Sequence, residues 1–417
     1  MFFELKLKPE LKQWLVGIKP SVLSRAPGQI AIMDRLDPQG RGMAVALPIS
    51  LSVTVAFTWS NKKPVGISQG FSDGGVLIAS ETFGEAIVTD WPTLHTHRLS
   101  HMQGGSSRRE RSDLSLSRKW GRLPFLSMIE TLIADDRPFF VTPGKWLIIY
   151  VRSNLPVGLG LSSSVAFLTA MVGGFSKAID FFLPKHQLAQ IVGKIEKVKM
   201  TAKPVSSHSL TALFGKPSQL LKLEYFGHQV RDFDFICPSP HFHEYYLVLL
   251  SPQFHVHQQV QRMKMREALF SCSLSFKGAK AMMDAFCHSL CIGDFPLADR
   301  LMQESSAVLD KQSHCFLFRE LREIIVRFRL EAKARFSIMG GCIAYGVSRP
   351  TFFQFVHKSY IDRFLREIRL SRSLSFWNGN ERLQSFVLQI GRGLSVLQKF
   401  PGFSATCGDV EDFSRTL

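Results

Sequence analysis

The chain has 417 residues, of which 45% are hydrophobic and 20% charged, a balance that is typical of a folded globular protein and excludes wholesale disorder. This length exceeds the usual size of one domain, so we expect two packed domains. The formal net charge of +17, from 51 Lys and Arg against 34 Asp and Glu, favours anionic small molecules as ligands.

The positive charge is scattered along the chain and is not gathered in one segment. Its densest run, residues 106–111, lies within a stretch rich in Ser, Gly and His that is typical of a surface loop. We therefore do not expect a nucleic-acid partner, and an interface for nucleic acid through residues 95–122 is the weaker alternative.

Cysteine usage and hydropathy bear on the compartment. The seven cysteines are odd in number and form no Cys-x-x-Cys pair, which suits reduced thiols better than a disulfide framework. No apolar run approaches the roughly 20 residues that a membrane-spanning helix needs. These features predict a cytoplasmic protein with no membrane partner.

The first half of the chain shows strand signals and then a strand followed by a helix. Residues 44–58 alternate in hydropathy and are rich in β-branched side chains, which predicts a strand, whereas residues 95–122 have the composition of a loop. Residues 146–151 predict a short buried strand. Residues 165–172 predict a helix that the pair Gly173–Gly174 ends.

The second half mixes strands and helices, and no internal repeat is visible. Residues 245–250 predict a strand, and residues 335–347 predict two strands around a tight turn at Gly340–Gly341. A domain boundary is expected near Gly227, which divides the chain into residues 1–227 and 228–417. Further helices are predicted over residues 188–199, 259–270, 279–290 and 317–330.

The stretch NLPVGLGLSSSVA, residues 154–166, connects the predicted strand to the predicted helix. Its glycines let the backbone approach a ligand closely, and free N–H groups at a helix N-terminus favour an anion such as phosphate. A serine hydroxyl at the helix start can also bind a metal ion that is held by the phosphate. A plain Ser-capped helix after a glycine turn is the alternative.

The same stretch resembles the signature of the GHMP kinases, Pro-x-x-x-Gly-Leu-Gly/Ser-Ser-Ser-Ala, and its triple serine resembles the galactokinase form. The residues that match in register are Pro156, Gly160, Leu161, Ser162, Ser163 and Ser164. Two weaker motifs of the family flank it in the expected order. Residues 25–32 resemble the Ala-Pro-Gly-Arg/Lys segment, and residues 334–342 resemble the final glycine-rich segment.

This resemblance implies an α+β fold with a two-domain GHMP-kinase-like architecture. The N-terminal domain would be an α/β domain like that of ribosomal protein S5, and the C-terminal domain a ferredoxin-like α+β domain. It also implies ATP and Mg²⁺ as cofactors. The implied nucleotide-binding residues are Pro156, Gly158, Gly160, Ser162, Ser163, Ser164, Gly340 and Gly341. Ser164 and Glu196 are the implied metal ligands, because Glu196 precedes His208 by the galactokinase spacing between metal-binding Glu and catalytic Asp.

The catalytic positions depart from the family pattern. His208 stands where galactokinases have the catalytic Asp, and Gln29 stands where Arg or Lys is expected. A neutral imidazole can accept a proton, or His208 can simply fill the former site, while an amide donates hydrogen bonds without carrying charge. The Gly-Glu-His segment is also replaced. Asp34 and Asp37 are the candidate substrate ligands there, or else ordinary turn carboxylates.

The features that hold nucleotide and metal are therefore kept, while those for proton removal, charge stabilisation and sugar recognition have changed. We expect ATP-dependent transfer of phosphate to a hydroxyl of a small molecule, in the first place a sugar. The alternative is a non-catalytic nucleotide or sugar sensor, a pseudokinase that keeps the GHMP fold.

Overall fold

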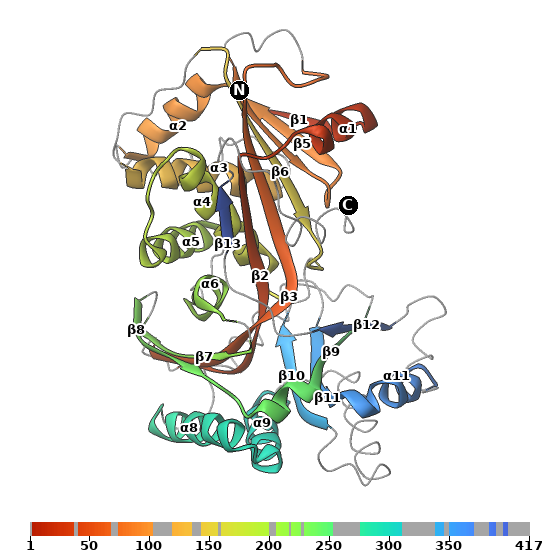
Figure 1. Ribbon diagram of the computed structural model, residues 1–417. Helices are drawn as coiled ribbons and strands as arrows, with labels where there is room; N and C mark the ends of the chain where they lie inside the picture. The colour runs from red at the N-terminus through yellow and green to blue at the C-terminus, as the bar shows by residue number, and fades with distance from the viewer. Residues whose placement is uncertain are drawn as a thin grey trace.

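The chain folds into two β-sheets with helices packed around them, so the predicted α+β class is confirmed (Figure 1). The computed structural model of the chain describes residues 2–36, 41–67, 74–102, 119–135, 143–156, 160–199, 206–216, 218–226, 229–252, 276–310, 338–345, 350–370, 383–388 and 395–398. Within these residues, none of the helices combines the length and the apolar character needed to cross a bilayer.

The larger sheet has nine strands, in the order β1-β5-β4-β6-β3-β2-β13, with β7 paired to β3 and β8 paired to β7. Strand β3 pairs with β7 through its first half and with β6 through its second, so the β2–β3 ribbon runs the length of the sheet (Figure 1). The strands are β1 (Phe2–Lys6), β2 (Val22–Leu36), β3 (Arg41–Ser60), β4 (Gly75–Ser80), β5 (Glu85–Thr89), β6 (Trp146–Ser153), β7 (Leu220–Phe226), β8 (Gln229–Ile236) and β13 (Ser395–Gln398).

The smaller sheet has four antiparallel strands in the order β10-β11-β9-β12. Its strands are β9 (Tyr245–Pro252), β10 (Ile338–Tyr345), β11 (Pro350–His357) and β12 (Leu383–Leu388). The helical segments of this part of the chain are η2 (Pro240–Glu244), α8 (Phe276–Ile292), α9 (Phe295–Asp310), η3 (Lys358–Tyr360) and α11 (Ile361–Leu370). The strand predicted at 245–250 and the helix predicted at 279–290 are confirmed. The helices predicted at 259–270 and 317–330 lie outside the described residues.

Helix α4 is the buried centre of the helical layer on the larger sheet. It contacts β2, β3, α3, α5 and α6, and nearly every side chain from Val165 to Ala178 is buried. A helix surrounded on most sides needs apolar residues around most of its circumference, which this sequence supplies. The helices beside this sheet are α1 (Pro9–Gly17), α2 (Trp91–Met102), α3 (Lys119–Asp135), α4 (Ser163–Ala178), α5 (Lys185–Lys199) and α6 (Ser206–Phe214).

The prediction that Gly173–Gly174 end this helix is wrong, because α4 continues to Ala178. A Cβ atom placed at Gly174 would overlap the Phe57 ring of β3 and lie 2.8 Å from Ser24 Cβ of β2. The glycine therefore lets the helix approach the sheet closely, and this packing outweighs the low helix propensity of glycine.

Two segments predicted as loop or turn are regular where the structure describes them. Of the predicted loop over 95–122, residues 95–102 belong to α2 and residues 119–122 to α3, and the rest lie outside the described residues. Trp91, the first residue of α2, stacks on Trp59 of β3 at a centroid distance of 5.6 Å. Gly340 and Gly341 do not make a turn between two strands. They lie inside β10, where the pairing with β11 shifts register between Met339 and Cys342, which is a β-bulge or similar irregularity.

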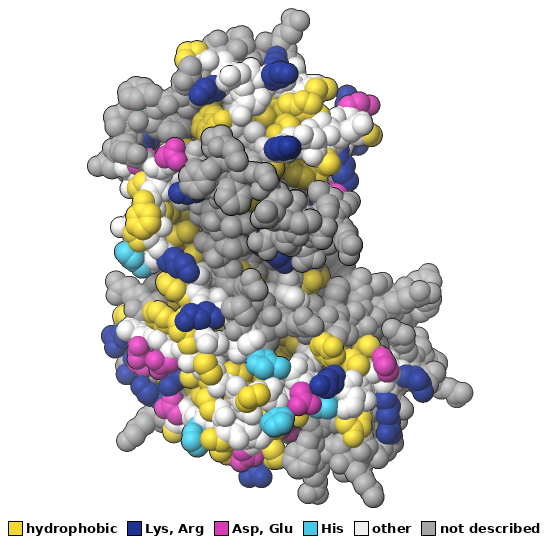
Figure 2. Space-filling model, viewed as in Figure 1, with side chains coloured by type: hydrophobic (Ala, Val, Ile, Leu, Met, Phe, Trp, Pro, Cys, Tyr) yellow, Lys and Arg dark blue, Asp and Glu magenta, His cyan; other side chains and the backbone are white. Residues whose placement is uncertain are grey.

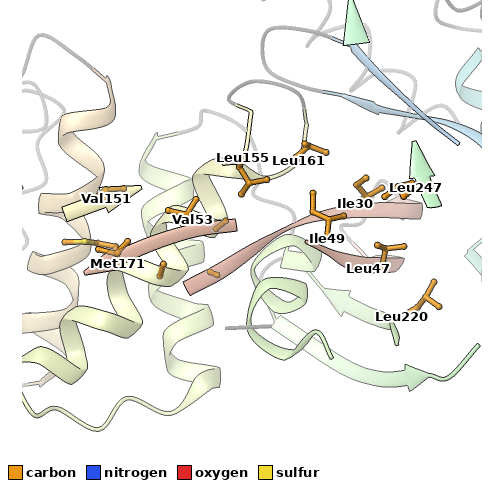
Figure 3. Packing of buried hydrophobic residues seen from close by; sticks show 14 of the residues in the cluster. Ile30, Leu47, Ile49, Val53, Val151, Leu155, Leu161, Met171, Leu220 and Leu247 are labelled. Atoms are coloured by element: carbon orange, nitrogen blue, oxygen red, sulfur yellow. The ribbon is translucent and has the colours of Figure 1, made fainter. Parts of the chain in front are cut away.

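One hydrophobic core extends from the larger sheet into the smaller one. It joins Ile30 and Leu47 of the β2–β3 ribbon to Leu247 of β9, which lie close together in Figure 3. A division of the chain near Gly227 would fall between the paired strands β7 and β8, so it stays a proposal.

Candidate functional site

The glycine- and serine-rich stretch joins the end of β6 to the start of α4, as predicted. Pro156 is half-buried and Gly160 has a positive φ of 76°, a conformation that glycine adopts without steric cost. Gly158, a predicted nucleotide-binding residue, lies outside the described residues. The structure thus has the strand–turn–helix connection that a phosphate-binding loop requires.

Two leucines anchor this loop in the core. Leu155 and Leu161 are 2% and 1% exposed, and both belong to the core cluster that contains Ile49 and Ile30 (Figure 3). Sequence reasoning attended to the glycines and serines and missed these anchors. The sequence did not single them out, because the stretch also contains Val157, Leu159 and Val165.

Ser162, immediately before the helix, has a left-handed backbone (φ 56°, ψ 37°), and its side chain makes no capping hydrogen bond to α4. Ser163 and Ser164 are the first two residues of the helix and are half-buried. A helix N-terminus leaves backbone N–H groups without intrahelical acceptors and carries partial positive charge. Without a side-chain cap from Ser162, this end of α4 suits an anion.

Gln29 of β2 lies against the same loop and is 1% exposed. Its backbone N–H donates to Leu161 O at 3.2 Å, and its side-chain Nε2 donates to Ser162 Oγ at 3.1 Å. The preceding residue, Gly28, leaves little room, because a Cβ there would lie 3.0 Å from Leu161 O. The structure therefore brings the first motif and the glycine–serine loop together.

Glu196 lies near the C-terminal end of α5 and is 5% exposed. The neighbouring Ile195 shares a hydrophobic cluster with Val165, which follows Ser164 at the start of α4. Glu196 and Ser164 therefore lie on two helices, α5 and α4, that pack against each other. The described residues contain no group of three or more His, Cys, Asp or Glu side chains able to hold a metal, so a cation here would also need oxygens from a ligand.

An ion pair that the sequence did not indicate links α5 to α3. Lys194 Nζ lies 2.5 Å from Glu130 Oε2, and Glu130 is 5% exposed. A second network reaches the entry to the loop, because Asn154 Oδ1 accepts from Ser52 N–H at 2.7 Å and Arg25 Nε donates to Ser52 Oγ at 2.7 Å. These contacts join residues that are far apart in sequence, so spacing could not reveal them.

The remaining predicted residues are located by their backbone. Asp34 lies on β2 opposite Ala44, and His208 lies in the first turn of α6, but their side chains are not described. Asp37 lies outside the described residues. Gly340 and Gly341 lie in β10, a strand that contacts β2.

Charge on the visible surface is mixed. Figure 2 shows Lys and Arg side chains dispersed among acidic and apolar ones. Several lysines of the described residues form ion pairs with carboxylates. Lys280 Nζ lies 3.1 Å from Glu224 and Lys12 Nζ lies 2.7 Å from Glu81. On the described part of this face, positive side chains are interspersed with acidic and apolar ones and do not form one basic patch.

Comparisons with known proteins agree with this geometry. Residues 127–207, which include the loop and Glu196, match the family described as GHMP kinases N terminal domain. The galactokinase of Thermotoga maritima is 34% identical over 90 residues, which are 22% of this chain and 25% of that protein. The matched region thus spans a quarter of the length of this curated relative.

Solved structures resemble the chain over nearly its whole length. The galactokinase of Lactococcus lactis, solved in complex with galactose, superposes with a TM-score of 0.66 at 14% identity and covers 93% of this chain and 98% of its own. The mevalonate kinase of Methanococcus jannaschii has a TM-score of 0.58 at 12% identity and covers 89% and 98%. These likenesses show the fold. Residues 127–207 therefore resemble the N-terminal domain of the GHMP kinases, with galactokinases among the similar sequences, and the chain as a whole shares the fold of the solved galactokinase and mevalonate kinase.

Proposed function

We propose that this chain binds ATP at the N-terminus of α4 and transfers the γ-phosphoryl group to a hydroxyl of a sugar or related small alcohol. The observation that carries the proposal is the start of α4, which the Ser162 side chain does not cap, behind a loop fixed by Leu155, Leu161 and Gln29. The likeness to galactokinases supports a sugar as the acceptor.

The residues around α4 fit a magnesium ion that is carried by the nucleotide. The Ser164 hydroxyl lies in the first turn of α4, and Glu196 is buried on the neighbouring helix α5. Hydroxyl and carboxylate oxygens are the donors that Mg²⁺ prefers. When bound, Mg²⁺ supplies positive charge to the phosphoryl oxygens. Ser164 and Glu196 would hold it.

In the proposed reaction the acceptor oxygen forms a bond to the γ-phosphorus, and the bond from that phosphorus to the ADP oxygen breaks. The acceptor proton leaves to His208 or to water. The first N–H groups of α4 and the loop would hold the phosphates, and Gly340–Gly341 would line the nucleotide from the other sheet. Asp34 and Asp37 would bind hydroxyls of the acceptor.

A non-catalytic nucleotide sensor is the second candidate, and the position of Gln29 favours it. The amide that replaces the expected cation is bonded to Ser162, so no charge from this residue stabilises the transition state. A sensor would bind Mg·ATP and gain thermal stability from it without transferring phosphate.

The test separates binding from turnover. Purified protein is titrated with Mg·ATP by calorimetry, and ADP release is then followed with a panel of sugars and related alcohols. We expect Mg·ATP binding, turnover with at least one acceptor, and loss of both turnover and Mg²⁺ dependence in Ser164→Ala and Glu196→Gln.

The matched control is Glu130→Gln, because Glu130 is as buried as Glu196 but pairs with Lys194. This variant should keep the Mg²⁺ dependence of binding. Binding without turnover across the whole panel would select the sensor, and absence of Mg·ATP binding would refute both functions. His208→Ala should lower turnover while leaving Mg·ATP affinity unchanged if His208 accepts the proton.

A further inference from the structure

Gln29 holds two successive residues at the junction between the loop and α4. Its backbone N–H bonds to Leu161 O and its side-chain amide bonds to Ser162 Oγ, across 133 positions of sequence. The pairing of β2 with β3 is irregular here, with a register shift between Pro27 and Gln29. This irregularity lets the main chain at Gln29 bond to the loop, so residue 29 serves the loop through both backbone and side chain.

Ser162 shows what these bonds achieve. Left-handed backbone torsions are unfavourable for a non-glycine residue and persist only when the surroundings hold it, and Ser162 has a φ of 56°. A serine before a helix usually turns its hydroxyl onto the first N–H groups of that helix. Here the hydroxyl accepts from Gln29 instead, and the side chain does not cap α4.

The remaining polar atom of Gln29 is also informative. Its Oε1 is buried and has no hydrogen-bond partner among the described residues. Such an acceptor is costly unless a donor reaches it. It belongs to the same amide group that contacts Ser162, so it lies beside the start of α4. A protonated group or a water molecule brought there by a ligand could satisfy it.

We propose that Gln29 is a positioning residue for the anion site. It holds Ser162 in the left-handed conformation and keeps the Ser162 hydroxyl from capping α4, so that the N-terminus of α4 can bind phosphate. The inference rests on the proposed function for its ligand. It assigns residue 29 a role different from that of the Arg or Lys expected there, because the amide acts through the loop and contributes no charge.

The test is a double-mutant cycle that combines substitutions of Gln29 with Ser162→Gly. Gln29→Leu should weaken Mg·ATP binding about tenfold, because Ser162 is released to relax and to cap the helix. Ser162→Gly adopts the left-handed conformation without help from residue 29, so its own Mg·ATP affinity, which includes any loss from the missing hydroxyl, is the reference for the second half of the cycle. Gln29→Leu in the Ser162→Gly background should then cost little, which is a rescue that only this role predicts.

Two outcomes would overturn the proposal. Equal weakening by Gln29→Leu in both backgrounds would show that Gln29 contacts the ligand itself. We expect Gln29→Arg to weaken binding as Gln29→Leu does. Tighter binding or faster turnover in Gln29→Arg would instead show that a positive charge at position 29 serves the site better than the amide. Ser24→Ala is the control, because Ser24 is a buried serine on the same strand and its loss should leave affinity unchanged.

The role of Gln29 can be tested even if the proposed function is wrong. If the wild-type protein does not bind Mg·ATP, the same cycle is measured on the free energy of unfolding in denaturant. Gln29→Leu should then destabilise the wild type but not the Ser162→Gly protein, and equal destabilisation would refute the clamp. Gln29→Asn, whose amide is one methylene too short to reach Ser162, should repeat the pattern if the leucine variant does not fold.

Discussion

Substitution of Gly28 by alanine should push the loop away from β2 and weaken nucleotide binding. The φ of Gly28 lies outside the left-handed region, so alanine meets no backbone penalty and the effect is steric. The new Cβ would lie 3.0 Å from Leu161 O and 3.1 Å from Ile49 Cδ1, and it would overlap Leu155 Cδ2, against 3.4–4 Å for ordinary contact. Leu161 O is main chain and cannot rotate away.

Overpacking of this kind costs about 1–3 kcal/mol. Ile49 and Leu155 are buried and cannot move aside easily, so the overlap is most readily removed if the loop shifts away from β2. A shifted loop would bind the nucleotide less tightly. The dissociation constant for Mg·ATP should therefore rise about 5-fold to 150-fold in calorimetric titration.

Gly193→Ala is the matched control. It lies inside α5 with no atom within 4 Å of the added Cβ, so it should raise the free energy of unfolding by about 0.8–1.0 kcal/mol. Its Mg·ATP affinity should not change. A folded Gly28→Ala protein with wild-type affinity would refute the view that the loop is pressed onto β2.

Three further predictions concern the core. Gly174→Ala should lower the free energy of unfolding by about 1–2 kcal/mol, because overlap with Phe57 exceeds the gain in helix propensity, and an unchanged denaturant midpoint would contradict the close helix–sheet contact. Thr169→Val should instead raise it by about 1 kcal/mol, since the buried hydroxyl has no partner among the described residues. Burial raises the pKa of Cys287 to about 12, so at about pH 8 iodoacetamide should modify it far more slowly than the exposed Cys237; equal rates by peptide mass spectrometry would show that Cys287 is accessible.

Much of the fold could be predicted from local pattern. The strand predicted over residues 44–58 is β3, which alternates between buried and half-buried residues only over 53–58 and is buried continuously over 42–49. The helical spacing over 188–199 corresponds to α5. The failures came where distant residues decide the local structure. Gly174 is tolerated inside α4 because the sheet passes close to it, and Gly340 lies in a strand because β11 pairs beside it.

The candidate site also has a part that the sequence predicts and a part that it does not. The strand, turn and helix around Ser162 follow from the order of apolar, glycine and serine residues, which is local information. The partnership with Gln29 does not, because it depends on β2 passing beneath the loop. The resemblance located Gln29 as a departure from the family pattern, but only the geometry shows that its amide is bonded to the loop.

Strand β13 has a consequence for the order of assembly. It pairs with β2 at Val22–Arg25, yet in the chain it follows every strand of the four-stranded sheet. During synthesis β2 therefore emerges long before the strand that covers this edge, and it presents unpaired backbone groups that can template aggregation. Fragments that stop before β13 should aggregate more readily than the full chain. All strands of the smaller sheet are synthesised before the last strand of the larger sheet becomes available.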